Sequence, residues 1–170
     1  SEMCIRDRLS AADAAFAGAV DAAQLMANSA KKAGIDIEVV REPNDGYWSN
    51  VWNNDAKGWC ACYWGGRPAE TMMFSAAYVA ESKWNDTMWK TTDSAVKFNQ
   101  LVKDARKELD ESKKRDILYE CQRLIYDDGG LLCPLFNSYV SANSKKIAHG
   151  KIAANWDSDG AKCVERWWFA

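Results

Sequence analysis

The pattern of apolar residues changes from a helical period to strict alternation at Gly34. Residues 10–33, which precede it, are rich in alanine, the residue with the strongest intrinsic helix propensity. Gly34 is placed to end that helix, because glycine tolerates the positive φ of a C-terminal cap. Residues 35–39 then alternate apolar and acidic side chains, which is typical of a strand with one buried face. A helix followed at once by such a strand favours folds that pack helices on a sheet.

Further helices and strands are predicted along the rest of the chain. A short helix is expected over residues 47–52, a second strand over 58–64 and a third strand over 131–140. Two amphipathic helices are expected within 92–128, whereas residues 69–91 have no regular pattern. This order of elements predicts an α/β fold class.

Composition and motifs disfavour several classes of function. The net charge of -2 at pH 7 argues against a nucleic-acid-binding surface, which needs a basic patch. A metal site is disfavoured because the chain has one histidine, His149, and no pair of CxxC motifs. The sequence also lacks the nucleophile and phosphate-loop motifs of common enzyme classes. We therefore predict a protein that is not an enzyme, binds no nucleic acid and holds no metal or other cofactor.

Nine tryptophans are the most unusual feature of the composition. Indole rings are costly to expose, so they line either a core or a binding cleft. Trp48, Trp59, Trp64 and Trp84 would offer flat faces to a sugar ring or a cationic ligand, although any one of them could belong to the core instead. Arg67 follows a glycine pair at the end of a predicted strand, where it would either bind a carboxylate or phosphate or remain solvated.

Four segments, taken in order, carry a resemblance to one protein family. They are residues 33–39 (AGIDIEV), residues 58–63 (GWCACY), the helix pair within 92–128 and residues 134–136 (PLF). Together they resemble the family 5 extracytoplasmic solute-binding proteins of bacterial ABC importers, the peptide/nickel and dipeptide/oligopeptide type. The resemblance covers nearly the whole chain.

The resemblance implies a fold of two α/β lobes, the type II periplasmic-binding-protein fold, with this chain as its C-terminal part. Residues 9–138 would form the C-terminal lobe, and residues 139–170 would return to the first lobe. The N-terminal lobe would be missing from this sequence. Residues 1–8 (SEMCIRDR) look like a translated sequencing adapter and are left out of the lobe.

The resemblance also implies ligand contacts at the edge of a cleft. Peptide binders of the family place an aspartate two residues after the position of Cys60, and this aspartate pairs with the α-amino group of the ligand. Cys62 stands there instead, and a neutral thiol cannot form that ion pair, so a peptide held by its N-terminus is not expected. With the tryptophans and Arg67, the predicted ligand-binding residues are Trp48, Trp59, Cys60, Cys62, Tyr63, Trp64, Arg67, Trp84, Asn85, Phe136 and Asn137.

The implied function is the capture of a peptide-like or other small polar solute between two lobes, followed by delivery to ABC permease subunits in the inner membrane. A periplasmic or lipid-anchored extracytoplasmic location follows from it. Two other hypotheses stay open. One is a tryptophan-rich carbohydrate-binding module with no transport role, although such modules are usually all-β. The other is an enzyme that uses Cys60 or Cys62 as a nucleophile.

Overall fold

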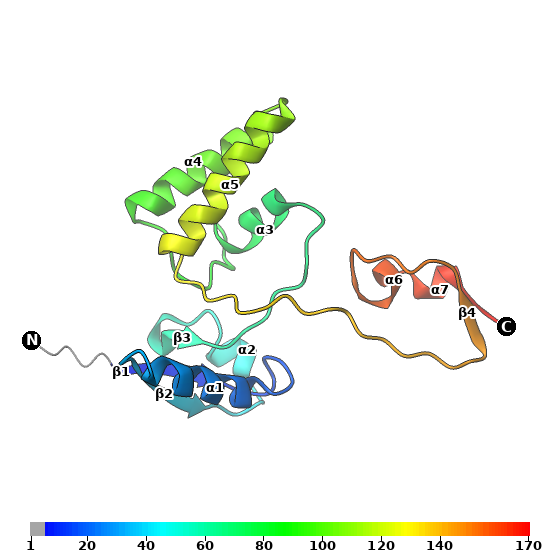
Figure 1. Cartoon of the computed structure of the whole chain (residues 1–170), viewed down its shortest axis with the longest axis horizontal. Coiled ribbons are helices and arrows are strands. Elements are labelled where there is room, and N and C mark those ends of the chain that lie inside the picture. The colour runs from blue at the N-terminus through cyan, green and yellow to red at the C-terminus, as the bar shows by residue number, and fades with distance from the viewer. Residues whose placement is uncertain (1–5) are drawn as a thin grey trace, which may run out of the picture.

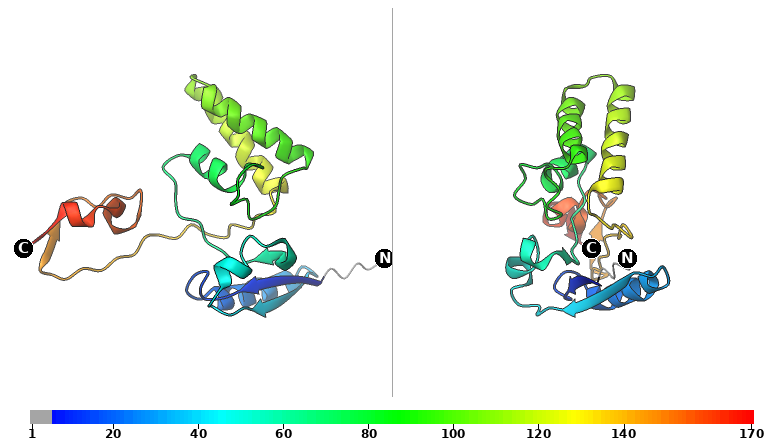
Figure 2. Two further views of the ribbon diagram at one scale, coloured as in Figure 1. Left: turned by 180° about the vertical axis from the view of Figure 1, so that it is seen from behind. Right: turned by 90° about the vertical axis from the view of Figure 1, so that its left-hand side faces the viewer.

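The structure of the protein is a computed structural model that describes residues 6–170. Its elements form a sheet unit, a helical unit and a C-terminal tail (Figures 1 and 2). The sheet unit contains β1 (Arg6–Ala11), α1 (Ala19–Lys31), β2 (Asp36–Arg41), α2 (Tyr47–Asn50), the 3-10 helix η1 (Asp55–Lys57) and β3 (Trp59–Cys60). The helical unit contains α3 (Glu70–Ala77), α4 (Asp93–Lys107) and α5 (Glu111–Asp128). The tail contains β4 (Ile147–His149), α6 (Asp157–Ala161), α7 (Cys163–Arg166) and β5 (Trp167–Phe169).

The sheet unit is built around β1, which pairs in parallel with both β2 and β3. Leu9 stands opposite Val39 on one side and opposite Trp59 on the other. Helix α1 packs on this sheet, and Leu9, Ala11 and Ala23 form the buried contact. The predicted helix, Gly34 cap and strand are confirmed, with φ of +79° at Gly34. The helix begins later than predicted, because the alanines at the start of the 10–33 segment are buried in β1 and the turn after it.

The first residues of β1 belong to residues 1–8, the segment predicted to be a translated adapter and to lie outside the lobe. Residues 6–8 pair with residues 36–38, and Arg8 lies 3.8 Å from the Glu38 carboxylate. The structure therefore places residues 6–8 in the sheet unit. The adapter origin of residues 1–8 stays a prediction, and residues 1–5 lie outside the described residues.

The helical unit confirms the two predicted amphipathic helices. Thr92 caps the start of α4 by accepting a hydrogen bond from the Ala95 N–H, and the Asp110 carboxylate caps α5 in the same way. The helices pack through a core that includes Phe98, which is fully buried between Phe74 and Trp89. Each helix thus has a defined start, and α5 ends at Gly129.

Two predictions about the irregular parts of the chain are wrong. Residues 70–77, expected to be irregular, form α3, which starts without a side-chain cap and was therefore hard to recognise. Residues 131–140, expected to form a strand, have no secondary structure, and residues 132–140 are exposed. Pro134 has no N–H to donate to a sheet, and no strand of the described residues runs beside this segment. The chain instead crosses from the helical unit to the tail (Figure 1).

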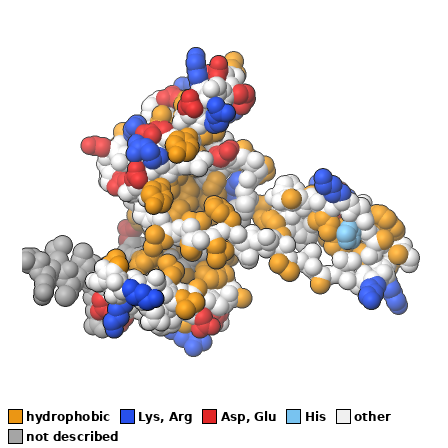
Figure 3. All heavy atoms as spheres, viewed as in Figure 1, with side chains coloured by type: hydrophobic (Ala, Val, Ile, Leu, Met, Phe, Trp, Pro, Cys, Tyr) orange, Lys and Arg blue, Asp and Glu red, His pale blue; other side chains and the backbone are white. Residues whose placement is uncertain are grey.

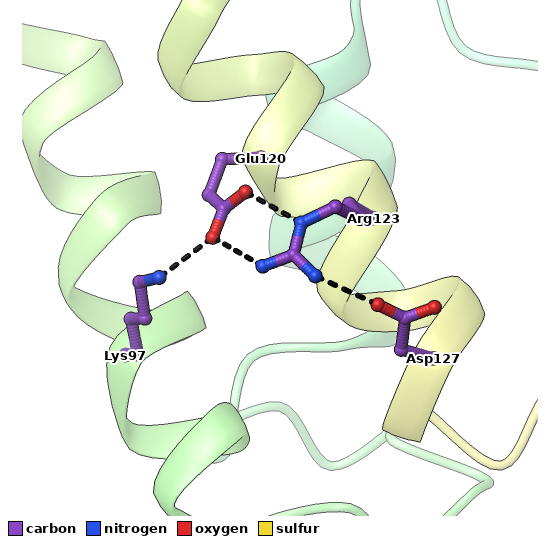
Figure 4. A network of polar contacts seen from close by, with 4 residues as sticks. All are labelled: Lys97, Glu120, Arg123 and Asp127. Atoms are coloured by element: carbon purple, nitrogen blue, oxygen red, sulfur yellow. Dashed lines mark hydrogen bonds and ion pairs between the residues drawn. The ribbon is translucent and has the colours of Figure 1, made fainter.

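A network of charged side chains joins α4 and α5 on their exposed faces (Figure 4). Glu120 accepts hydrogen bonds from Arg123 at 2.8 Å and from Lys97 at 2.6 Å, and Arg123 also binds Asp127. Arg123 first and Lys97 second lower the pKa of Glu120 from 4.5 to about 2. The ionised Glu120 carboxylate therefore stabilises the folded state at neutral pH, and this contribution is lost as the pH falls from 4.5 toward 2. Exposed pairs of this kind contribute little to the free energy of unfolding.

The tail is organised around Asp159, which is only 4% exposed. Its carboxylate accepts hydrogen bonds from the Ala153 N–H and the Trp167 indole and forms an ion pair with Arg166. β4 and β5 pair antiparallel beside it. The tail extends away from the sheet and helical units in the view of Figure 1, and its Trp156 ring lies 5.6 Å from the Arg67 guanidinium of the segment after β3. None of the helices within residues 6–170 combines the length and the apolar character needed to cross a membrane.

Candidate ligand-binding site

Tyr47 sets the path of the chain where it leaves β3. This side chain is 1% exposed, and its hydroxyl donates hydrogen bonds to the Ala61 carbonyl at 2.7 Å and to the Ser10 carbonyl at 3.2 Å. The Ala61 N–H in turn donates to Ser10, so the end of β3 is tied to β1. Residues 62–67 continue beyond the sheet toward the helical unit. Loops at the carboxyl ends of parallel strands are where α/β folds bind ligands.

One carboxylate, that of Asp86, lies where three segments of the chain meet. Its Oδ2 atom accepts a hydrogen bond from the Trp52 indole at 2.7 Å and one from the Trp64 indole at 3.2 Å. The Cys62 thiol donates to the same atom at 3.5 Å. Asp86 belongs to the loop after α3, whereas its donors follow α2 and β3. All three donors are neutral, and Asp86 forms no ion pair with a described lysine or arginine (residues 6–170).

Aromatic rings surround this carboxylate. Trp52 stacks on Trp84 with 5.5 Å between ring centroids and contacts Trp64 edge to face at 6.1 Å. Trp48 contacts both Trp52 and Tyr63 edge to face. We call these five rings and Asp86 the Asp86 cluster. Hydrophobic side chains gather between the sheet unit and the helical unit on the face seen in Figure 3.

Arg67 extends this arrangement toward the tail. Its guanidinium lies over the Trp64 ring at 5.9 Å and over the Trp156 ring at 5.6 Å. One of its nitrogens also donates to the Gly65 carbonyl at 2.7 Å. The residue is thus held between two indoles and a backbone carbonyl. A carboxylate or phosphate site would instead need the guanidinium N–H groups of Arg67 to be free to bind the anion.

The thiols near Asp86 are held in their protonated form. Burial, together with the charge of Asp86, raises the pKa of Cys62 far above its usual value, and the same two causes raise the pKa of Cys60. A thiolate is the reactive form of cysteine, so both residues are poor nucleophiles at neutral pH. The hypothesis of a cysteine-dependent enzyme is disfavoured by this environment.

Alkylation should separate these thiols from an exposed one. With iodoacetamide at pH 7, Cys60 and Cys62 should react at least about tenfold more slowly than Cys133, which is exposed. Mass spectrometry of the digested protein, sampled over time, gives the three rates side by side. Faster labelling of Cys62 than of Cys133 would contradict the environment described above and return the enzyme hypothesis to consideration.

Three residues predicted to bind ligand have other partners in the structure. Trp59 packs against the core of Leu9, Ala11 and Ala23 between the sheet and α1. Asn85 is 1% exposed, and its amide donates hydrogen bonds to the backbone carbonyls of residues 78, 79 and 89. Both placements favour a structural role. Cys60 likewise packs against the cluster that contains Tyr47.

The remaining predicted residues divide into two groups. Trp48, Cys62, Tyr63, Trp64 and Trp84 come together in or beside the Asp86 cluster. Phe136 and Asn137 instead lie on the exposed 132–144 segment, where Phe136 is 95% exposed. The structure gives these two no contact with the cluster.

Sequence reasoning missed the residue at the centre of the site. Asp86 directly follows Asn85 within the sequence Trp84-Asn85-Asp86, between two tryptophans of an irregular stretch. Trp52 was assigned only to a short helix. A carboxylate flanked by indoles is the signal that would have pointed to Asp86. Within residues 6–170, no group of three or more His, Cys, Asp or Glu side chains is placed to hold a metal ion, and the described cysteines are free thiols.

The fold is similar to part of a solved protein. No protein-family model matches the sequence, and no curated protein matches it. The crystal structure of NikZ from Campylobacter jejuni in complex with Ni(L-His) is similar over 74% of this chain, with a TM-score of 0.55 and 13% sequence identity. The matched part is 25% of NikZ, so this chain spans about a quarter of that protein's length. At this identity the similarity establishes a shared mixed helix-and-strand fold.

Proposed function

We propose that this chain is part of one lobe of a solute-binding protein that delivers a small polar or peptide-like solute to the permease of an ABC importer. The observation that carries the proposal is the similarity of 74% of the chain to 25% of NikZ, a protein whose crystal structure was solved in complex with Ni(L-His). The family 5 resemblance of the sequence supports the same function. The proposal implies an extracytoplasmic location.

The exposed apolar segment supports the proposal of a missing lobe. Leu132, Leu135, Phe136 and Val140 are between 62% and 95% exposed along one stretch of chain. Contiguous apolar surface of this kind marks a contact with another protein surface. In the proposed whole protein, the other lobe covers this segment and closes over the Asp86 cluster. Closure is favoured because the solute then contacts both lobes at once.

The architecture disfavours the carbohydrate-binding module. The longest elements of the described chain are the helices α1, α4 and α5, whereas such modules are usually all-β. The exposed faces of Trp48 and Tyr63 remain compatible with a sugar as the transported solute.

The first test is the natural gene. Sequencing upstream of Leu9 in the source genome should reveal a much longer frame that opens with a signal peptide and lies beside permease and ATPase genes. The restored protein should then become more compact on solute binding, measured as a fall in the radius of gyration by small-angle X-ray scattering. A start codon directly before Ser1, with no transporter genes nearby, would refute the proposal.

A further inference from the structure

The outer side of α5 carries two tyrosines that the rest of the chain leaves uncovered. Tyr119 is 72% exposed and Tyr126 is 87% exposed. They stand close to two helical turns apart, so they share one side of the helix with Arg115 and Gln122. We call these four residues the α5 face, and none of them belongs to the charged network that joins α5 to α4 (Figure 4). Tyrosine and arginine are residue types that protein–protein interfaces favour.

A groove borders the first half of the α5 face. Its volume is about 470 Å³, and it lies between Thr71 at the start of α3 and Leu118 of α5. Arg115, Tyr119 and Gln122 also line this groove, whereas Tyr126 lies one turn beyond its edge. The α5 face thus has a hollow at one end and a projecting ring at the other.

Charge is distributed unevenly along α5. Residues 111–119 contain three cations and two acids, whereas residues 120–128 contain one cation and three acids. The helix dipole favours the opposite order, with acids at the start and cations at the end. Lys113, Lys114 and Arg115 form no ion pair within residues 6–170. The cations at the start of α5 therefore oppose its dipole and have no acid of the described chain to offset them.

A second copy of α5 that runs antiparallel to the first fits all three features. Its acidic end then lies beside the cationic start of the first helix, and the two helix dipoles point in opposite directions. A two-fold axis between residues 120 and 121 sets Arg115 opposite Tyr126 of the second copy, and Tyr119 opposite its Gln122. The guanidinium can stack on the facing tyrosine ring, which enters the groove. A parallel copy would instead bring like charges together.

We propose that the α5 face binds a second copy of this chain, with the two α5 helices antiparallel and Tyr126 of each copy in the groove of the other. A two-fold contact uses the same surface on both copies, so one self-complementary face is sufficient. One helix and one groove from each copy make a small interface, so the dimer is expected to form and dissociate readily. The inference is independent of the proposed transport function, because it uses no residue of the Asp86 cluster.

Sedimentation velocity over a range of concentrations tests for the dimer. The 170-residue chain should change from monomer to dimer as its concentration rises, and Tyr126→Ala and Arg115→Glu should each weaken the association at least about tenfold. Phe136→Ala removes a similarly exposed ring from the 132–144 segment and should leave the association unchanged. Circular dichroism confirms that the variants are folded. A chain that stays monomeric, or unchanged association in either α5 variant, would overturn the proposal.

Cysteine cross-linking tests the antiparallel arrangement. With a rise of about 1.5 Å per residue, the two copies of residue 122 would lie about 4.5 Å apart along the helix axes, and the two copies of residue 112 about 25 Å apart. In a Cys133→Ser background, Gln122→Cys should therefore form a disulfide-linked dimer with oxidised glutathione at least about tenfold faster than Ser112→Cys. Both positions are exposed, so access to the oxidant is matched. If Ser112→Cys cross-linked as fast as Gln122→Cys, the proposed arrangement would be wrong.

Discussion

Replacing Asn85 with alanine will lower the free energy of unfolding by about 3 kcal/mol. The amide of Asn85 donates to the carbonyls of Tyr78, Val79 and Trp89 at 3.2, 3.3 and 3.0 Å, and its side chain is buried. Alanine would remove the buried donor of the Tyr78 and Trp89 carbonyls, whereas the Val79 carbonyl would keep its hydrogen bond from the Ser82 N–H. Urea unfolding followed by circular dichroism measures the loss.

A matched variant shows whether burial causes this loss. Asn143 also donates to two backbone carbonyls, those of residues 144 and 147, but it is exposed. Asn143→Ala should therefore change the unfolding free energy by less than about 0.5 kcal/mol, because water replaces the lost donor. If Asn85→Ala left stability unchanged and weakened solute binding by the restored protein, Asn85 would be a ligand contact, as the sequence analysis predicted.

Replacing Phe98 with alanine will destabilise the helical unit by about 3–5 kcal/mol. The Phe98 ring is fully buried and lies 5.5 Å from the Phe74 ring and 5.2 Å from the Trp89 ring. Its removal leaves a cavity that these two rigid rings cannot fill by small movements. Chemical denaturation gives the total loss, and Val96→Ala on the exposed side of α4 serves as the control.

Hydrogen exchange shows which part of the chain is destabilised by Phe98→Ala. The buried residues around Phe98 form one cluster, whereas those of the sheet unit form two others that include Tyr47 and Leu9. Exchange in Phe98→Ala should therefore speed up in peptides from α4 and α5 more than in peptides from β1 and β2. Equal acceleration in both units would mean that they unfold as one cooperative body.

Local sequence patterns were sufficient to predict helices α1, α4 and α5 and strand β2. Helices α4 and α5 follow from amphipathic periodicity, and their starts at Thr92 and Asp110 satisfy free N–H groups within the same few residues. The end of α1 and the start of β2 follow from Gly34. In each case the residues that determine where the element starts or ends lie within one helical turn of that boundary.

Errors arose where distant contacts decide the outcome. Residues 10 and 11 have the composition of a helix, yet they form the end of β1 because Ala11 is buried against α1 and Leu9 lies between two strands. The 131–140 segment has the apolar content of a strand, but no strand within residues 6–170 pairs with it. Local propensity cannot report whether a partner strand is present.

The same limit explains the partial prediction of the site. Tryptophan content suggested that Trp48, Trp59, Trp64 and Trp84 would offer ring faces to a ligand. The structure brings Trp48, Trp64 and Trp84 together around Trp52 but packs Trp59 against the core of the sheet unit, and ligand binding by these rings stays a prediction. The link to Asp86 spans 34 residues from Trp52 and 22 from Trp64, so no local pattern contains it. A single sequence therefore identifies the rings more readily than the charge they surround.

The central position of β1 has a consequence for biosynthesis. This strand precedes both of its neighbours in the sequence, and β3 pairs with it only after about fifty further residues have been made. A ribosome adds roughly 5–20 residues per second, so the two edges of β1 stay uncovered for seconds at the tunnel exit. Chaperones that hold nascent strands would act on this segment before any other part of the sheet.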